Sequence, residues 1–310
     1  MKLLITGKDG QVGSELCRSL ASLGHIEAVG HKDLDLCDVD AIRRSIRQMD
    51  PDVIVNAAAY TAVDKAEEES ELAFAVNARA PQVMAEEAAK AGVALVHYST
   101  DYVFDGQKHA PYTEDDATAP INIYGASKLA GEQAIAESGA AHIIFRTSWV
   151  YAARGKNFFL TMLRLGSSQA EIKVVQDQIG APTWSRSIAE VTAAVLKDCF
   201  RDRHFVRQKG IARIQERQGI YNLTCQGSTS WFGFARAIFQ ELTPGVSVLP
   251  IPSSEYKTAA RRPAYSVLDG SKVKATFGIS LPQWEQALHQ MIEEGGFARP
   301  ETSPAGGRAS

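Results

Sequence analysis

The 310-residue sequence lacks the features that mark several specialised classes of protein. No run of about 18 apolar residues occurs, so no membrane-spanning helix is expected. The formal net charge is only -3, which gives no reason to expect a nucleic acid partner. The first residues, "MKLLITGKDGQVG", lack the long apolar region and small-residue cleavage site of a signal peptide, so none is expected.

Cysteine is scarce, and its few positions lie far apart. The four cysteines, at 17, 37, 199 and 225, show no metal-site spacing and no disulfide-framework pattern. We therefore expect reduced thiols in a cytoplasmic protein. Hydrophobic residues make up 45% and charged residues 22%, which is ordinary for a soluble globular protein.

Short apolar runs alternate with helical patterns through the first half of the chain. We expect strands at 2–6, 26–30, 52–59, 94–100 and 142–148, separated by amphipathic helices. Continuously apolar strands between helices indicate a parallel sheet covered on both faces. The sequence therefore predicts the α/β class, with a Rossmann-like doubly wound parallel sheet and a smaller C-terminal substrate-binding lobe.

The regular alternation weakens after residue 148, and this sets the expected domain organisation. Residues 1–148 are expected to form an NAD(P)-binding domain, completed by parts of 184–226, with 149–183 and 227–296 as the lobe. The charge-rich segment 200–218 lacks clean apolar periodicity and is expected to be an exposed insertion. The small, polar tail 297–310 is expected to be disordered.

Three glycines follow the first expected strand and open the first helix. Gly7, Gly10 and Gly13 have the spacing G-x-x-G-x-x-G. In this context glycines allow a sharp turn and close approach of a pyrophosphate to the helix N-terminus. After the second strand come Gly30, His31 and Lys32, which favour NADPH, although the acids Asp33 and Asp35 leave NADH open. Asp35 and Leu36 are placed where an adenine ring could rest.

A tyrosine and a lysine four residues apart begin a later helix, in "NIYGASKLAGE". Tyr124 and Lys128 share one helix face, and Ser99, Thr100 and Asp101 lie at the end of an earlier strand. A lysine cation lowers the pKa of a nearby tyrosine, and a strand-end hydroxyl can hold a carbonyl oxygen. Together with the glycine loop, this set indicates carbonyl reduction by a nicotinamide cofactor.

Several longer stretches resemble one family of the extended short-chain dehydrogenase/reductase superfamily, the dTDP-4-dehydrorhamnose reductases. They include "GKDGQVG", "VNAAAYTAVDKAE", "HYSTDYVFDG", "YGASKLAGE", "FRTSWVYA" and "DQIGAPT", and the resemblance covers nearly the whole chain. It implies reduction of the 4-keto group of dTDP-4-dehydro-6-deoxy-L-mannose to dTDP-L-rhamnose with NADPH or NADH, which feeds polysaccharide synthesis.

The resemblance also implies roles for individual residues. Thr100, Tyr124 and Lys128 match the catalytic positions, and Lys128 also matches a ribose contact. The remaining matches to cofactor positions are Gly10, Gln11, Val12, Ala59, Tyr60, Thr61 and Tyr98. Asp101 and Trp149 match substrate contacts, and Thr100 is expected to contact the substrate as well.

The sequence departs from the family where some members dimerise through a metal held by three glutamates. Glu15 and Glu294 match two of these positions, but Arg186 occupies the third. A cation there would repel a metal, so magnesium is not predicted, and the arginine could instead neutralise both carboxylates in a homodimer without metal.

Two other functions stay open at this stage. An epimerase, or a reductase of another nucleotide sugar, uses the same Tyr–Lys pair. The regulatory subunit of methionine adenosyltransferase also resembles this family, so a non-catalytic binding partner is the third interpretation. Intact Thr100, Tyr124 and Lys128 argue against that third interpretation.

Overall fold

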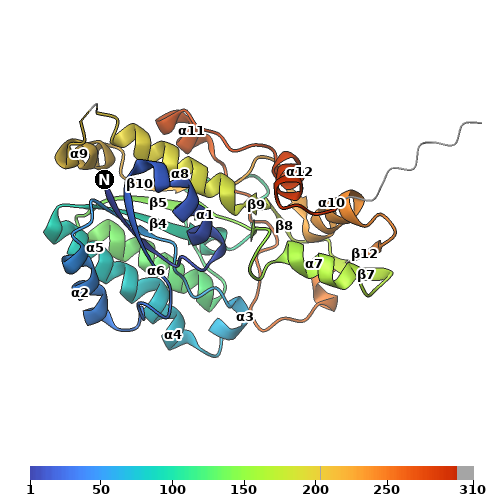
Figure 1. Ribbon diagram of the computed structural model, residues 1–310. Helices are drawn as coiled ribbons and strands as arrows, with labels where there is room; N and C mark the ends of the chain where they lie inside the picture. The colour runs from blue at the N-terminus through green and yellow to red at the C-terminus, as the bar shows by residue number, and fades with distance from the viewer. Residues whose placement is uncertain (203, 299–310) are drawn as a thin grey trace, which may run out of the picture.

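A computed structural model describes residues 1–202 and 204–298 (Figure 1). Its strands are β1 Lys2–Thr6, β2 His25–Val29, β3 Val53–Asn56, β4 Ala94–Thr100, β5 Ala141–Thr147, β6 Val150–Tyr151, β7 Glu171–Val175, β8 Ile179–Gly180, β9 Thr183–Trp184, β10 Gly219–Asn222, β11 Thr229–Ser230 and β12 Ser247–Ile251. Its α-helices are α1 Gln11–Ser19, α2 Val39–Met49, α3 Val63–Ala66, α4 Ser70–Phe74, α5 Ala80–Ala91, α6 Ile123–Glu137, α7 Phe158–Gly166, α8 Ser185–Cys199, α9 Arg207–Glu216, α10 Trp231–Leu242, α11 Ser271–Phe277 and α12 Trp284–Glu294. Short turns complete it: η1 Ala21–Leu23, the π-helical η2 Ala75–Arg79, η3 Asp101–Val103 and η4 Ser253–Glu255.

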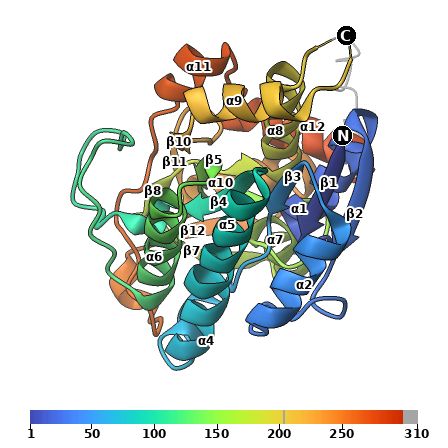
Figure 2. The same cartoon turned by 90° about the vertical axis from the view of Figure 1, so that its left-hand side faces the viewer.

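A six-stranded sheet with the order β10-β5-β4-β3-β1-β2 forms the centre of the molecule. Every neighbouring pair in it is parallel. Helices α1 and α8 pack together on one face, and α2, α5 and α6 cover the other, as Figures 1 and 2 show. The predicted doubly wound α/β fold is therefore confirmed.

The strands carry apolar residues on both faces of the sheet, which explains why helices cover both faces. Leu3 and Ile5 of β1 pack in the cluster beneath α1 and α8, whereas Leu4 packs in the cluster beneath α2 and α5. All four residues of β3 are buried. The strand expected over 52–59 is shorter than predicted, because it ends at Asn56 and the next residues turn into the cavity described below.

Segments of the C-terminal half, among them α7, α10, β7 and β12, form a smaller lobe beside the main sheet (Figure 1). Three two-stranded ladders lie in it, β12 with β7, β11 with β8 and β6 with β9. Helix α10 packs on α7, β7 and β12. Not all later elements belong to the lobe. Strand β10 returns to the edge of the main sheet and pairs with β5.

The part of segment 200–218 that forms α9 is not wholly exposed, contrary to the prediction of an exposed insertion. Helix α9 packs against β5 and α8, and Ile214 of this helix is fully buried. Arg207 bonds Asp52 at 2.5 Å, so charge pairing supplies the anchor that apolar periodicity did not reveal. Most of the tail expected to be disordered lies outside the described residues.

Candidate active site

The glycine loop connects β1 to α1 with very little space around its backbone. Gly7 has φ +77°, and an added Cβ there would lie 2.7 Å from the Ala58 nitrogen. A Cβ on Gly13 would lie 2.0 Å from the Gly7 oxygen, so Gly13 allows the helix to approach the loop. Gly10 is the N-cap of α1 and offers no side-chain cap, which leaves the helix N-terminus open to an anion.

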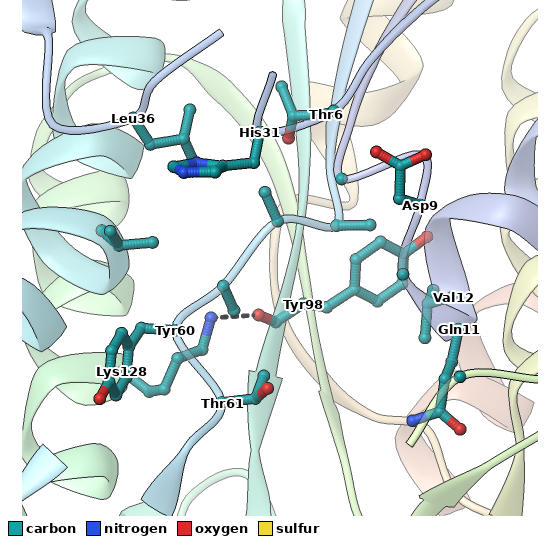
Figure 3. Close-up of a pocket in the computed structure, with 18 of the residues that line it drawn as sticks. Thr6, Asp9, Gln11, Val12, His31, Leu36, Tyr60, Thr61, Tyr98 and Lys128 are labelled. Atoms are coloured by element: carbon teal, nitrogen blue, oxygen red, sulfur yellow. Dashed lines mark hydrogen bonds between the residues drawn. The ribbon is translucent and has the colours of Figure 1, made fainter. Parts of the chain in front are cut away.

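A cavity of about 610 Å³ opens at this loop and at the carboxyl ends of the central strands (Figure 3). The residues predicted to bind cofactor that line it are Gly7, Gly10, Gln11, Val12, Asp35, Leu36, Ala59, Tyr60, Thr61, Tyr98, Tyr124 and Lys128. Gly13 does not line it, since its place is against Gly7. A dinucleotide suits such a cavity, which is largely apolar and has donors at a helix N-terminus.

The lining also includes residues that the sequence analysis did not select. Asp9 lies beside Gly30, where an added Cβ would be 2.0 Å from the carboxylate oxygen Oδ2. His31 lines the cavity, whereas Lys8 of the loop is paired with Asp33 at 2.5 Å. The only signal for Asp9 in the sequence is its position inside the glycine loop.

Helix α6 carries Tyr124 and Lys128 in its first turns. Asn122 caps the helix by accepting the Gly125 N–H at 2.8 Å, and its amide nitrogen donates to the Arg261 carbonyl at 2.8 Å. A Cβ on Gly125 would lie 2.1 Å from the Tyr102 oxygen, so this glycine brings α6 close to the segment after β4. The cap and the close approach place the helix start at the cavity.

Tyr124 is held as a protonated phenol. Desolvation raises its pKa to about 12, and the Asp101 charge acts in the same direction. A hydrogen bond with the Thr100 hydroxyl opposes the shift, which places Thr100 at the phenol oxygen. The structure thus brings together the expected acid and the expected strand-end hydroxyl.

Lys128 is almost completely buried, with 1% of its surface exposed. Its Nζ donates to the Tyr98 carbonyl at 2.6 Å, the dashed bond in Figure 3, and lies 3.1 Å from His97 Nε2. Burial lowers the pKa of Lys128 to about 8, with Glu132 opposing the shift. A lysine with this pKa can change its charge near neutral pH.

The three expected substrate contacts do not line the cavity. Thr100 donates to Asp101 Oδ1 at 3.0 Å, and burial raises the pKa of Asp101 to about 7. Trp149 has φ +46° and stacks on Trp231 with ring centroids 3.5 Å apart. It therefore lies at the junction of β5 with the lobe, against Gly180.

The lobe touches the glycine loop directly. The Asn157 side chain, at the start of α7, donates to Gln11 Oε1 at 2.8 Å, and Gly155 and Lys156 line the cavity. Local sequence patterns could not pair Asn157 with Gln11, because the two residues lie far apart in the chain. The cavity is consequently shared between the sheet and the lobe.

Arg186 occupies the space between two carboxylates. It bonds Glu15 at 3.0 Å and also pairs with Glu294, so it links α8 to α1 and α12. Within residues 1–202 and 204–298, no group of three or more histidine, cysteine, aspartate or glutamate side chains is arranged to hold a metal.

The same described part of the chain contains no helix long and apolar enough to cross a membrane.

A doubly wound sheet, a glycine loop and a Tyr–Lys helix at one cavity define a nicotinamide-dependent oxidoreductase of the extended short-chain dehydrogenase/reductase type. Comparison with known proteins narrows this class. Residues 1–296 match the family model described as the RmlD substrate binding domain. A dTDP-4-dehydrorhamnose reductase of Burkholderia thailandensis is 49% identical, over 95% of this chain and 99% of that protein.

Two solved structures agree with this result. A dTDP-4-dehydrorhamnose reductase of Clostridium acetobutylicum superposes with a TM-score of 0.86 at 36% identity, covering 95% of this chain and 99% of that chain. The enzyme of the same name from Bacillus anthracis, solved in complex with NADP, gives a TM-score of 0.84 at 36% identity, with 94% and 99% covered. The chain belongs to the dTDP-4-dehydrorhamnose reductase family.

Proposed function

We propose that this protein reduces the 4-keto group of dTDP-4-dehydro-6-deoxy-L-mannose to give dTDP-L-rhamnose, with NAD(P)H as the reductant. The observation that carries the proposal is the position of Tyr124 and Lys128, which line the same cavity as the glycine loop. The names of the relatives at 36–49% identity support the choice of substrate.

Three side chains, Thr100, Tyr124 and Lys128, carry the proposed reaction. A bound reduced nicotinamide would supply a hydride to the carbonyl carbon. The Thr100 hydroxyl, near Tyr124, turns from Asp101 to hold the carbonyl oxygen, and Tyr124 gives its proton to that oxygen as negative charge develops. Lys128 in its charged form then stabilises the tyrosinate that remains. Asp101 and Trp149 stay our candidates for substrate contacts outside the cavity.

Replacement of Tyr124 by phenylalanine tests this mechanism. Tyr124→Phe should reduce kcat at least ~10²-fold while leaving cofactor binding intact, because only the transferred proton is removed. The assay follows NAD(P)H oxidation with the keto sugar and identifies the product, which separates net reduction from an epimerase that recycles its cofactor. Tyr112→Phe is the matched control, since Tyr112 lies outside the cavity and bonds Asp105. Unchanged turnover in Tyr124→Phe would remove Tyr124 from this role.

NADPH is our proposed reductant, with NADH accepted. The NADP complex of the Bacillus anthracis relative supports this choice, and His31 lines the cavity. Asp9 acts against it, because a carboxylate disfavours a neighbouring 2′-phosphate. Rates with NADPH and NADH in parallel, at equal concentration, decide the preference.

The domain division, the homodimer without metal and the cytoplasmic location also remain proposals. The salt bridges of Arg186 to Glu15 and Glu294 support the neutralisation of both carboxylates. Light scattering with and without Mg²⁺ tests the metal-free dimer, and a metal-dependent change in mass would exclude it.

A further inference from the structure

A row of polar side chains crosses the buried sheet toward Lys128. Thr6 of β1 is in register with Asn56 of β3, and Asn56 is in register with His97 of β4. Each of the three is at most 1% exposed. We call these three residues the polar row. Buried polar groups of this kind are retained only with defined partners, so the hydrogen bonds of the row have one consistent arrangement.

The orientation of the Asn56 amide is fixed by a backbone donor. Its Oδ1 accepts the Ala58 N–H at 3.2 Å and the Thr6 hydroxyl at 2.6 Å. The Nδ2 group therefore points to His97, at 3.0 Å from the ring nitrogen Nδ1. An amide nitrogen can only donate, so Nδ1 of His97 must be the accepting nitrogen.

This acceptor role determines where His97 carries its proton. A neutral imidazole with a lone pair on Nδ1 has its N–H on Nε2, and Nε2 faces Lys128 Nζ at 3.1 Å. An ammonium group has three donors and no acceptor, whereas a neutral amine can accept one hydrogen bond. The Nε2–H is therefore satisfied only while Lys128 is uncharged.

We propose that His97 is a positioning residue for Lys128: it favours the neutral amine before the cofactor binds, so that the charging of Lys128 is coupled to cofactor arrival. The inference rests on the proposed role of Lys128 in the reaction. An anionic cofactor in the cavity that Lys128 lines favours the ammonium form. The proton comes from solvent, so binding takes up a proton.

The charged groups around this pair are consistent with the proposal. Burial and the neighbouring Lys128 lower the pKa of His97 well below its usual range, so the imidazole stays neutral. Glu132, on the same helix, is the charge that favours the Lys128 ammonium, but Arg146 of β5 bonds both of its oxygens. Thr100, at the end of β4, and Asp101, which follows it, act on Tyr124 instead. Asn77 of η2 is directed to Ser127 and the Tyr60 backbone.

The first test is the tautomer of His97 in the cofactor-free protein. Long-range ¹H–¹⁵N correlation spectra of protein with ¹⁵N-labelled histidine distinguish the two neutral forms and the imidazolium. The His97 signals are those lost in His97→Gln, or, if that variant does not fold, those left after the other histidines are replaced one at a time. We expect the neutral Nε2–H form at about pH 9, above the Lys128 pKa of about 8. An Nδ1–H form or an imidazolium would overturn the proposal.

The second test measures proton uptake on cofactor binding. Titration calorimetry with NADPH, in two buffers of different ionisation enthalpy at about pH 9, gives the number of protons taken up. Wild type should take up a substantial fraction of a proton, approaching about one. His97→Gln should take up at least ~3-fold less, because a glutamine carbonyl accepts from the ammonium and Lys128 is already charged. Equal uptake in the two proteins would contradict the coupling.

A matched control exists on the neighbouring strand. His142 of β5 is also buried, but its Nδ1 contacts the Ala140 carbonyl and not Lys128, so His142→Gln should leave proton uptake unchanged. Neither test depends on turnover. A protein that shows the expected tautomer and uptake but no sugar reduction would disprove the proposed function alone, whereas an active enzyme with the other tautomer would disprove the role of His97 alone.

Discussion

The buried ion pair behind the catalytic helix offers a quantitative test of how α6 is held. Arg146 of β5 donates from Nε and Nη2 to the two oxygens of Glu132, at 2.9 and 2.6 Å. The two side chains are 2% and 1% exposed. The Arg146 guanidinium also lies over the Phe104 ring, 5.1 Å from its centroid. If one partner is removed, the other side chain is too deeply buried for water to solvate its charge.

Removal of one partner should therefore cost far more than removal of both. Glu132→Leu leaves the Arg146 cation buried, and Arg146→Met leaves the Glu132 anion buried, each at a cost of about 3–5 kcal/mol in unfolding free energy. That is a large part of a typical total of about 5–15 kcal/mol. The double variant leaves no buried charge and should lie within about 1–2 kcal/mol of wild type.

Urea unfolding, followed by tryptophan fluorescence and circular dichroism, gives these free energies if the slope with urea stays constant. Arg201→Met is the control, because Arg201 forms an exposed pair with Asp198 and should cost no more than about 1 kcal/mol. Single variants that lose under about 1 kcal/mol would refute the reasoning, as would a double variant that loses the sum of both.

Three further outcomes are expected. Gly13→Ala should weaken NADPH binding at least ~10-fold by calorimetry, because the alanine methyl group would lie 2.0 Å from the Gly7 oxygen. Gly245→Ala is the control: its methyl group would lie in open space, so NADPH binding should not change. The pKa of Asp101 is raised to about 7 in the folded protein, so wild type should lose unfolding free energy between about pH 4 and about pH 7. Asp101→Asn should make that loss smaller in urea unfolding. Parallel stability curves for the two proteins would contradict the raised pKa. Asp9→Asn should raise the ratio of kcat/KM for NADPH over NADH about 10-fold, and an unchanged ratio would show that Asp9 does not face the ribose.

Local signals in the sequence were sufficient to predict most of the helices and strands. The amphipathic helix expected between the strands at 26–30 and 52–59 is α2, Val39–Met49, and the strand expected at 94–100 is β4. These predictions succeeded because caps, breakers and apolar periodicity act over a few residues. The Tyr–Lys spacing likewise indicated one helix face, and the structure places both side chains at the cavity.

Contacts between distant segments could not be read in the same way. Asn56 and His97 are 41 residues apart, and their bond depends on the lateral register of β3 and β4. Register is determined by packing across the sheet, which no local pattern encodes. The π-helical turn at Ala75–Arg79 was missed for a related reason: it places Asn77 against Tyr60 and Ser127, a tertiary requirement inside an otherwise regular helical sequence.

The return of β10 to the main sheet has a consequence for how the chain folds during synthesis. β5 pairs with β4 on one side and with β10 on the other, and the first part of the lobe, residues 149–183, lies between β5 and β10 in the sequence. Until residues 219–222 leave the ribosome, the outer edge of β5 has unpaired N–H and C=O groups that invite pairing with another chain. A fragment that stops near residue 148 would keep this edge open and would tend to aggregate. The nucleotide-binding sheet is thus completed only after the first part of the lobe, residues 149–183, has been made.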